Sequence, residues 1–298
     1  MSSACITLGW GSGRRRKRVW SKRRRCLGDR RNWAFSLTNR CYIAGFQGQF
    51  GHRGEMAAQL YTVARANEHL EHQAWGLAGQ AMATLPLGQI EQAARALNTA
   101  LSLYASVSAS ALGETAIQGT LAVLCLRQGQ SQLARQAAET TARLLAKTSF
   151  PFYSLIDGYT AVADVYLALW EEDLFPASTT SQTQANSPMG ALARPACRAL
   201  HRFARIYPIG QPHAWLCQGL YDWLDGQPAQ ARNAWRKSLA HAERLAMPYD
   251  EGQAHYELGR HASGDERKPH LTRAAEIFER LGAAYDLERT QMAMNAMA

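Results

Sequence analysis

The sequence has no long apolar run and few of the groups that usually build enzyme sites. No stretch approaches 18 consecutive apolar residues, so we expect no membrane-spanning helix. The six cysteines include no C-x-x-C pair, and six thiols in 298 residues are too few for a disulfide scaffold. These absences argue against a zinc ribbon, a thioredoxin-like site and a membrane protein. They predict a cytoplasmic protein with free thiols.

Motifs for nucleotide binding and hydrolysis are missing as well. The sequence holds no G-x-x-x-x-G-K-[ST] loop, no H-E-x-x-H zinc motif and no G-x-S-x-G elbow, and it suggests no Cys–His pair. His69 and His72 are spaced to face one metal from a helix, but a third ligand is not evident nearby. The carboxylates of residues 171–173 point different ways around a helix, which favours a solvated face. We therefore expect no catalytic residue, no cofactor, no metal and no enzymatic activity.

Positive charge is concentrated at the start of the chain. The whole sequence has 33 Lys+Arg and 24 Asp+Glu, a net charge of +9, but residues 1–40 hold twelve of the basic residues and one acid. The remainder is therefore slightly acidic, and the basic character belongs to this segment alone. We expect residues 1–40 to form a disordered, basic extension.

Three interpretations of this extension remain open. One is a solvated tail without a function, and the other two assign it a function. Arginines interleaved with Trp10, Trp20 and Trp33 suit a nucleic-acid or anionic-surface arm, because guanidinium groups bind phosphates and indoles stack on bases. An arginine-rich segment almost free of acids is also typical of targeting sequences. If nucleic acid binds this protein, we expect it to bind only through this arm.

From residue 41 onward the pattern is helical. Apolar residues recur three and four positions apart, as in the stripe of Ala93, Ala96, Leu97, Ala100 and Leu101. Runs of alternating β-branched residues are almost absent. The sequence thus predicts an all-α fold.

A glycine followed five positions later by an alanine recurs along the chain. The instances are Gly88 with Ala93, Gly129 with Ala134, and Gly226 with Ala231. A repeated turn glycine and a repeated small residue in the following helix indicate a series of antiparallel helical hairpins. Gly282 is expected to mark a further turn.

One hairpin shows the pattern most fully. Trp215 opens its first helix, Gly219 is the small residue where the two helices cross, and Gly226 makes the turn. We expect Ala231 to approach Gly219 closely, with Trp235 filling the neighbouring space. A weaker copy follows, in which the structural positions are Leu258, Gly259, Ala274 and Phe278.

These hairpins resemble the tetratricopeptide (TPR) repeat. The stretches L-A-M-P-Y-D-E-G (245–252), E-L-G-R-H (257–261) and residues 270–283 are also similar to the C-terminal helical repeats of large bacterial ATPases that carry adenylate/guanylate cyclase domains. The resemblance implies an α-solenoid of TPR-like hairpins that forms the C-terminal part of a larger ATPase- or cyclase-type signalling protein. It also implies a non-catalytic module that binds a protein or peptide partner in its concave groove. The chain lacks the catalytic and nucleotide-binding parts of such proteins.

A polar, uncharged stretch interrupts the helical pattern at residues 176–188 and predicts a flexible linker. It divides the expected array into repeats over 41–175 and 189–298. Pro195 follows soon after the linker and suits the first turn of a helix.

Overall fold

The computed structural model describes residues 33–106, 110–148, 152–175 and 188–295, and all regular structure in these ranges is helical. A first helix over 33–46 precedes α2 (Phe50–Ala66), α3 (Leu70–Thr84), α4 (Ile90–Ala105), α5 (Ala111–Arg127), α6 (Ser131–Lys147), α7 (Ile156–Leu174), α8 (Pro188–Ile206), α9 (Gln211–Leu224), α10 (Pro228–Leu245), α11 (Pro248–Arg260), α12 (Arg267–Leu281) and α13 (Ala284–Asn295). The all-α prediction is confirmed. Among the described helices, none combines the length and apolar character needed to cross a bilayer.

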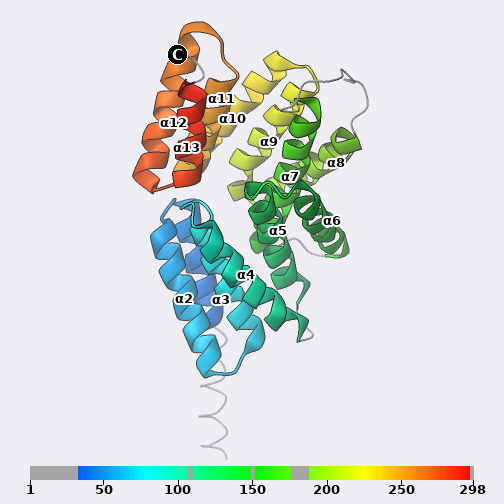
Figure 1. The fold of residues 1–298 in the computed structure, drawn as a ribbon, viewed down its shortest axis with the longest axis vertical. Coiled ribbons are helices and arrows are strands. Elements are labelled where there is room, and N and C mark those ends of the chain that lie inside the picture. The colour runs from blue at the N-terminus through cyan, green and yellow to red at the C-terminus, as the bar shows by residue number, and fades with distance from the viewer. Residues whose placement is uncertain (1–32, 107–109, 149–151, 176–187, 296–298) are drawn as a thin grey trace, which may run out of the picture.

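Consecutive helices pack as antiparallel neighbours. The pairs α3/α4, α5/α6, α7/α8, α9/α10 and α11/α12 each form a hairpin, and successive hairpins lie side by side (Figure 1). This arrangement fits a helical-repeat fold. The finer description as an α-solenoid stays a prediction, because the ends of the array meet each other.

The turn glycines have the conformation that the sequence predicts. Gly88, Gly129, Gly226 and Gly282 all have φ between +66° and +76°, which side chains on other residues rarely tolerate. At the first three, the next residue is a glutamine whose backbone N–H donates to the carbonyl five residues earlier, at 2.8–3.0 Å. This 6→1 bond is the Schellman ending of a helix. The recurring Gly-Gln dipeptide is therefore the local signal that ends α3, α5 and α9.

The alanines that follow these glycines are packed completely. Ala93, Ala134 and Ala231 each have no exposed surface. A small side chain at this position lets the second helix lie close against the first.

Trp235 packs directly over Gly219. The three atoms nearest to a Cβ at Gly219 would all belong to the indole of Trp235, the residue expected to fill the space beside this glycine. Side chains on a helix lean toward its N-terminus, which carries the long indole back toward the turn. Ala231 belongs to the same apolar cluster as Trp235, together with Leu216 and Leu258, and its close approach to Gly219 stays a prediction.

The N-terminal boundary is also corrected. Residues 33–40, expected to belong to the extension, are helical. Ala34 and Leu37 are buried against Met56 and Leu60 of α2. Burial of an apolar face therefore starts the folded body at residue 33. The basic cluster itself lies in residues 1–32, outside the described ranges.

The expected linker does not separate two cores. Helices α7 and α8, on either side of it, pack as one hairpin, and a single core cluster contains both Trp170 and Leu200. The described structure resumes at Pro188, which opens α8, so residues 176–187 connect two helices of one hairpin. Pro195 lies inside α8 and not in its first turn.

The two ends of the described array touch. The rings of Phe50 and Tyr249 meet edge to face with centroids 5.3 Å apart, and Phe50 belongs to the same apolar cluster as Phe278. A Cβ at Gly88 would lie 3.3 Å from that of Ala284. Figure 1 shows the ends of α2–α4 facing the ends of α12 and α13. These contacts between the two ends of the array help to enclose an inner cavity.

Candidate functional site

The inner cavity has a volume of about 440 Å³ and is lined mainly by the first helices of four hairpins, namely α5, α7, α9 and α11, together with α13. Its charged wall residues are seven carboxylates (Asp157, Asp164, Glu171, Glu172, Asp250, Glu257 and Asp286), four guanidinium groups (Arg53, Arg127, Arg260 and Arg289) and His213. Even with His213 counted as a cation, carboxylates outnumber positive groups by seven to five.

Arg260 is held by two carboxylates across this cavity. Its Nη1 and Nη2 atoms contact the two oxygens of Glu171 at 2.7 and 3.2 Å, and its Nε donates to Glu257 at 2.7 Å. Burial by itself raises the pKa of Glu257, but Arg260 and His261 outweigh it and lower that pKa to about 2. Glu171 is thus an ion-pair partner, where the sequence pattern favoured a solvated face.

Arg127 joins the middle of the chain to its end. It donates to the backbone oxygen of Leu85 and to the hydroxyl of Tyr249, and its Nη2 lies 3.9 Å from Asp286 Oδ2. Asp286 is 3% exposed and also accepts from Tyr249 at 2.7 Å and from Gln253 at 2.9 Å. These bonds supply the partners that a buried charge requires.

A cluster of histidine, cysteine and aspartate occupies another part of the wall. His213 Nε2 lies 2.8 Å from Asp164 Oδ1, and the Cys217 thiol donates to the same oxygen at 3.4 Å. On the other side of the ring, His213 Nδ1 lies 3.7 Å from Asp250 Oδ1. The donor atoms of Asp164, His213 and Cys217 all lie within 4.8 Å of one another, so this set could hold a metal ion.

The neighbours of this cluster set its protonation. Burial lowers the pKa of His213, but the adjacent Asp164 outweighs burial and holds that pKa well above its ordinary value. Burial raises the pKa of the Cys217 thiol to about 12. Without a metal, the group is therefore an imidazolium–carboxylate pair beside a neutral thiol.

Sequence reasoning did not find this cluster. Asp164 and His213 are 49 residues apart and meet only because α7 packs against α9. The available signal was the spacing of His213 and Cys217, which lie four residues apart on one helix and therefore share a face.

A second, mostly apolar cavity of about 580 Å³ lies among the N-terminal helices and includes His69 and His72. Their rings stack with centroids 3.7 Å apart, and His69 Nδ1 accepts from the backbone N–H of His72 at 3.3 Å. Burial and the neighbouring His69 lower the pKa of His72 to about 4. These contacts cap helix α3, so the pair has a structural role.

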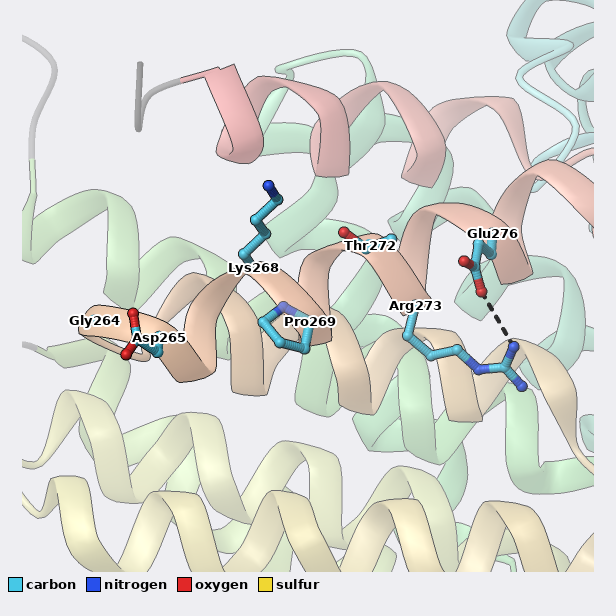
Figure 2. A pocket seen from close by; sticks show the side chains of 7 residues that line it. All are labelled: Gly264, Asp265, Lys268, Pro269, Thr272, Arg273 and Glu276. Carbon is cyan, nitrogen blue, oxygen red and sulfur yellow. Dashed lines mark hydrogen bonds and ion pairs between the residues drawn. The ribbon is translucent and has the colours of Figure 1, made fainter.

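A wide hollow on the outer side of α12 is less suited to binding. Figure 2 shows its side chains spread along the helix without converging on one point. Arg273 pairs with Glu276 at 3.3 Å and with Glu251 at 3.1 Å, and the Arg273 and Glu276 side chains are about half exposed. Exposed pairs of this kind offer little to a ligand.

The predicted repeat positions lie away from the inner cavity. Trp215, Gly219, Gly226, Ala231 and Trp235 belong to the α9/α10 hairpin. The α11/α12 hairpin contains Leu258, Gly259, Ala274 and Phe278. None of the nine is among the residues that line the inner cavity. Gly226 makes the turn, the role of the others is packing, and the cavity is formed by other residues of the same hairpins.

Comparison with known proteins gives a fold likeness only. No family model matches the chain, and no curated protein matches it in sequence. Among solved structures, BtubC (BKLC) from P. vanneervenii is similar, with 17% identity and a TM-score of 0.49, over 83% of this chain and 92% of that chain. At this level of similarity, no residue role or function carries over from BtubC.

Proposed function

We propose that this protein is a non-catalytic interaction module whose inner cavity receives a short, basic segment of a partner protein. The observation that carries the proposal is the position of the cavity on the first helices of the stacked hairpins, where helical-repeat proteins present their binding surface. Its volume of about 440 Å³ suits a few side chains of a partner.

The charges of the wall support a basic partner. Arg127 and Arg260 are already engaged by carboxylates of the chain itself. Burial raises the pKa of Asp157, and the other six carboxylates still outnumber the five positive groups. This excess leaves a negative field in a recess partly shielded from water, which attracts lysine and arginine side chains.

The resemblance of the stretches between residues 245 and 283 to the repeats of ATPase and cyclase proteins supports a signalling context for this module. A cytoplasmic location is supported by the free, buried thiols of Cys41, Cys125, Cys197 and Cys217. Turnover of ATP by the purified chain, abolished by a point substitution within it, would contradict the non-catalytic proposal.

A peptide array tests the binding proposal. The full chain is applied to peptides of varied sequence, and the affinity of the peptides that bind is then measured by fluorescence anisotropy. We expect enrichment of lysine and arginine, and affinities that fall as salt rises. Enrichment of acidic or uncharged apolar peptides would contradict the proposed partner class.

A matched pair of variants locates the binding. Ala168 lines the cavity, so Ala168→Trp should fill it and weaken peptide binding at least about tenfold. Ala240 is exposed on α10 and is not among the cavity residues, so Ala240→Trp should leave affinity unchanged. Equal effects of the two substitutions would place binding elsewhere.

The arginine and tryptophan run in residues 14–31 favours a second candidate function, nucleic-acid binding. That function requires binding that weakens steeply with salt and disappears when residues 1–32 are deleted. The deletion stops at residue 32 because the first helix begins at 33. Binding that survives the deletion would exclude the arm as the site.

A further inference from the structure

Three metal-ligating side chains converge on the wall of the inner cavity. His213 and Cys217 lie one turn apart on the same face of α9, and Asp164 faces them from α7. The Asp164 oxygen is 2.8 Å from His213 Nε2 and 3.4 Å from Cys217 Sγ. The packing of α7 against α9 therefore places one nitrogen, one sulfur and one oxygen ligand close together.

The spacing of these atoms suits a tetrahedral ion. With metal–ligand lengths of about 2.0–2.3 Å, a tetrahedral zinc site separates its donor atoms by roughly 3.3–3.8 Å. The three donors lie within 4.8 Å of one another, so side-chain movements of about 1 Å would bring them to the separations of a tetrahedral site. The Asp164 side chain is 33% exposed and has room for this adjustment.

A second carboxylate lies near the other nitrogen of the His213 ring. Nε2 faces the other two donors, while Nδ1 lies 3.7 Å from Asp250 Oδ1, slightly beyond a direct hydrogen bond. Metal-bound histidines commonly donate this second nitrogen to a carboxylate, and Asp250 is placed to accept from Nδ1 after a small shift.

An alternative role for Cys217 as a nucleophile does not fit its surroundings. The residue has no exposed surface, so a substrate cannot reach its sulfur from the cavity. An ion held between the three side chains needs no such access, because Asp164 and His213 line the cavity and provide the entry path.

We propose that Asp164, His213 and Cys217 bind one Zn²⁺ ion, with its fourth position open to the inner cavity. A thiolate and an imidazole favour zinc over Mg²⁺ and Ca²⁺, which prefer oxygen ligands. Coordination would join α7 to α9, and the open position would take a water molecule or a ligand atom. On binding, Zn²⁺ displaces one proton from the imidazolium of His213 and one from the Cys217 thiol, and both protons pass to solvent. The resulting thiolate and the Asp164 carboxylate balance the charge of the ion. This inference does not depend on the proposed peptide binding.

Metal titration of the untagged full chain tests the site. The reduced protein is stripped with a chelator and titrated with ZnCl₂ in competition with a chromophoric zinc indicator. We expect one equivalent to bind with a Kd of the order of micromolar or tighter. With Co²⁺ we expect a thiolate-to-metal charge-transfer band and intense visible bands, which report a sulfur ligand and tetrahedral geometry.

Substitutions assign the ligands. Asp164→Asn, His213→Gln and Cys217→Ser should each weaken zinc binding roughly tenfold or more. Cys125→Ser and His52→Gln, which change residues outside the cluster, should leave the Kd within about twofold of the wild type. Circular dichroism establishes that each variant is folded.

If Cys217→Ser does not fold, a chain with the other five cysteines changed to serine replaces it, and the cobalt charge-transfer band should persist in that chain. Three results would overturn the site. They are no stoichiometric zinc binding by the wild type, an unchanged Kd in folded Asp164→Asn, and a cobalt spectrum without the charge-transfer band.

Discussion

At the scale of single residues, the closest packing places glycine against an aromatic ring. Gly219 on α9 lies under the indole of Trp235, and a Cβ at Gly252 on α11 would approach Cε1 of Phe278 to 2.7 Å. Trp235 and Phe278 are both completely buried. The α9/α10 and α11/α12 hairpins each accommodate a large ring in the second helix because the first helix has no side chain at the facing position.

Gly219→Ala tests this contact. The added methyl group overlaps the indole of Trp235, so the substitution should lower the free energy of unfolding by about 1–3 kcal/mol. Gly54→Ala is the matched control in α2, where the new Cβ meets Ala83 at an ordinary 3.6 Å. The control should stabilise the protein by about 0.5–1 kcal/mol through helix propensity. Urea denaturation measures both, and the same sign for both would refute the contact.

The ion pair between Glu257 and Arg260 makes stability depend on pH. The pKa of Glu257 falls from 4.5 to about 2 on folding, so its stabilisation is complete above pH 4.5 and is lost as pH falls toward 2. At neutral pH we expect Glu257→Gln to cost about 2–3 kcal/mol. The difference from the wild type should shrink between pH 4.5 and pH 2.

Urea denaturation at pH 7, 5 and 3 measures this pH dependence. Glu91→Gln is the control, because Glu91 and its partner Arg95 have side chains that are 93% and 73% exposed. That substitution should change stability by less than about 0.5 kcal/mol at every pH. A loss for Glu257→Gln that stays constant from pH 7 to pH 3 would contradict the linkage.

At the scale of elements, the hairpin is the unit of construction, and its two helices do not need a short connection. Helices α9 and α10 are joined by a tight glycine turn, whereas α7 and α8 form an equivalent hairpin across residues 176–187. The apolar stripes of α7 and α8 drive their pairing, because a single core cluster contains residues of both helices.

Cleaving the chain within residues 176–187 tests this conclusion. A protease site introduced there should be cut without separating the two pieces, since α7 and α8 share the core of Trp170 and Leu200. After cleavage we expect co-elution in gel filtration and an unchanged circular-dichroism spectrum. Separation into two folded pieces would instead support independent domains over 41–175 and 189–298.

At the scale of the whole molecule, the array closes on itself. Arg127 of α5 reaches Tyr249 of α11 and Asp286 of α13, and Phe50 packs against Tyr249. The contact between the two ends encloses a cavity with charged walls. Both the proposed peptide binding and the proposed zinc site lie in this cavity.

Asp286→Ala should weaken this closure. It leaves Arg127, whose side chain is 12% exposed, without its carboxylate, and removes the acceptor of Tyr249 and Gln253. We expect a loss of about 3–5 kcal/mol in the free energy of unfolding. Small-angle scattering should show a larger radius of gyration. An effect as small as that of Glu91→Gln would mean that the contact does not hold the ends together.

The sequence by itself determined the features that depend on neighbouring residues. Helical periodicity, the positive φ of Gly88 and Gly226 and the burial of Ala93 and Ala231 follow from local geometry, because a helix turn involves only residues a few positions apart. The helix start at residue 33 does not follow from the sequence pattern. Its apolar stripe is short and directly follows a run of basic residues, which by itself indicates an extension without a core.

Only the tertiary structure decided what the cavity contains. Glu171 meets Arg260 across 89 residues, and Asp164 meets His213 across 49. Such pairs depend on the rotation of each hairpin relative to the next. Many side-chain contacts between neighbouring hairpins together determine that rotation. The sequence shows which face of a helix carries a charged residue. The packing of the whole array determines which oppositely charged residue lies next to it.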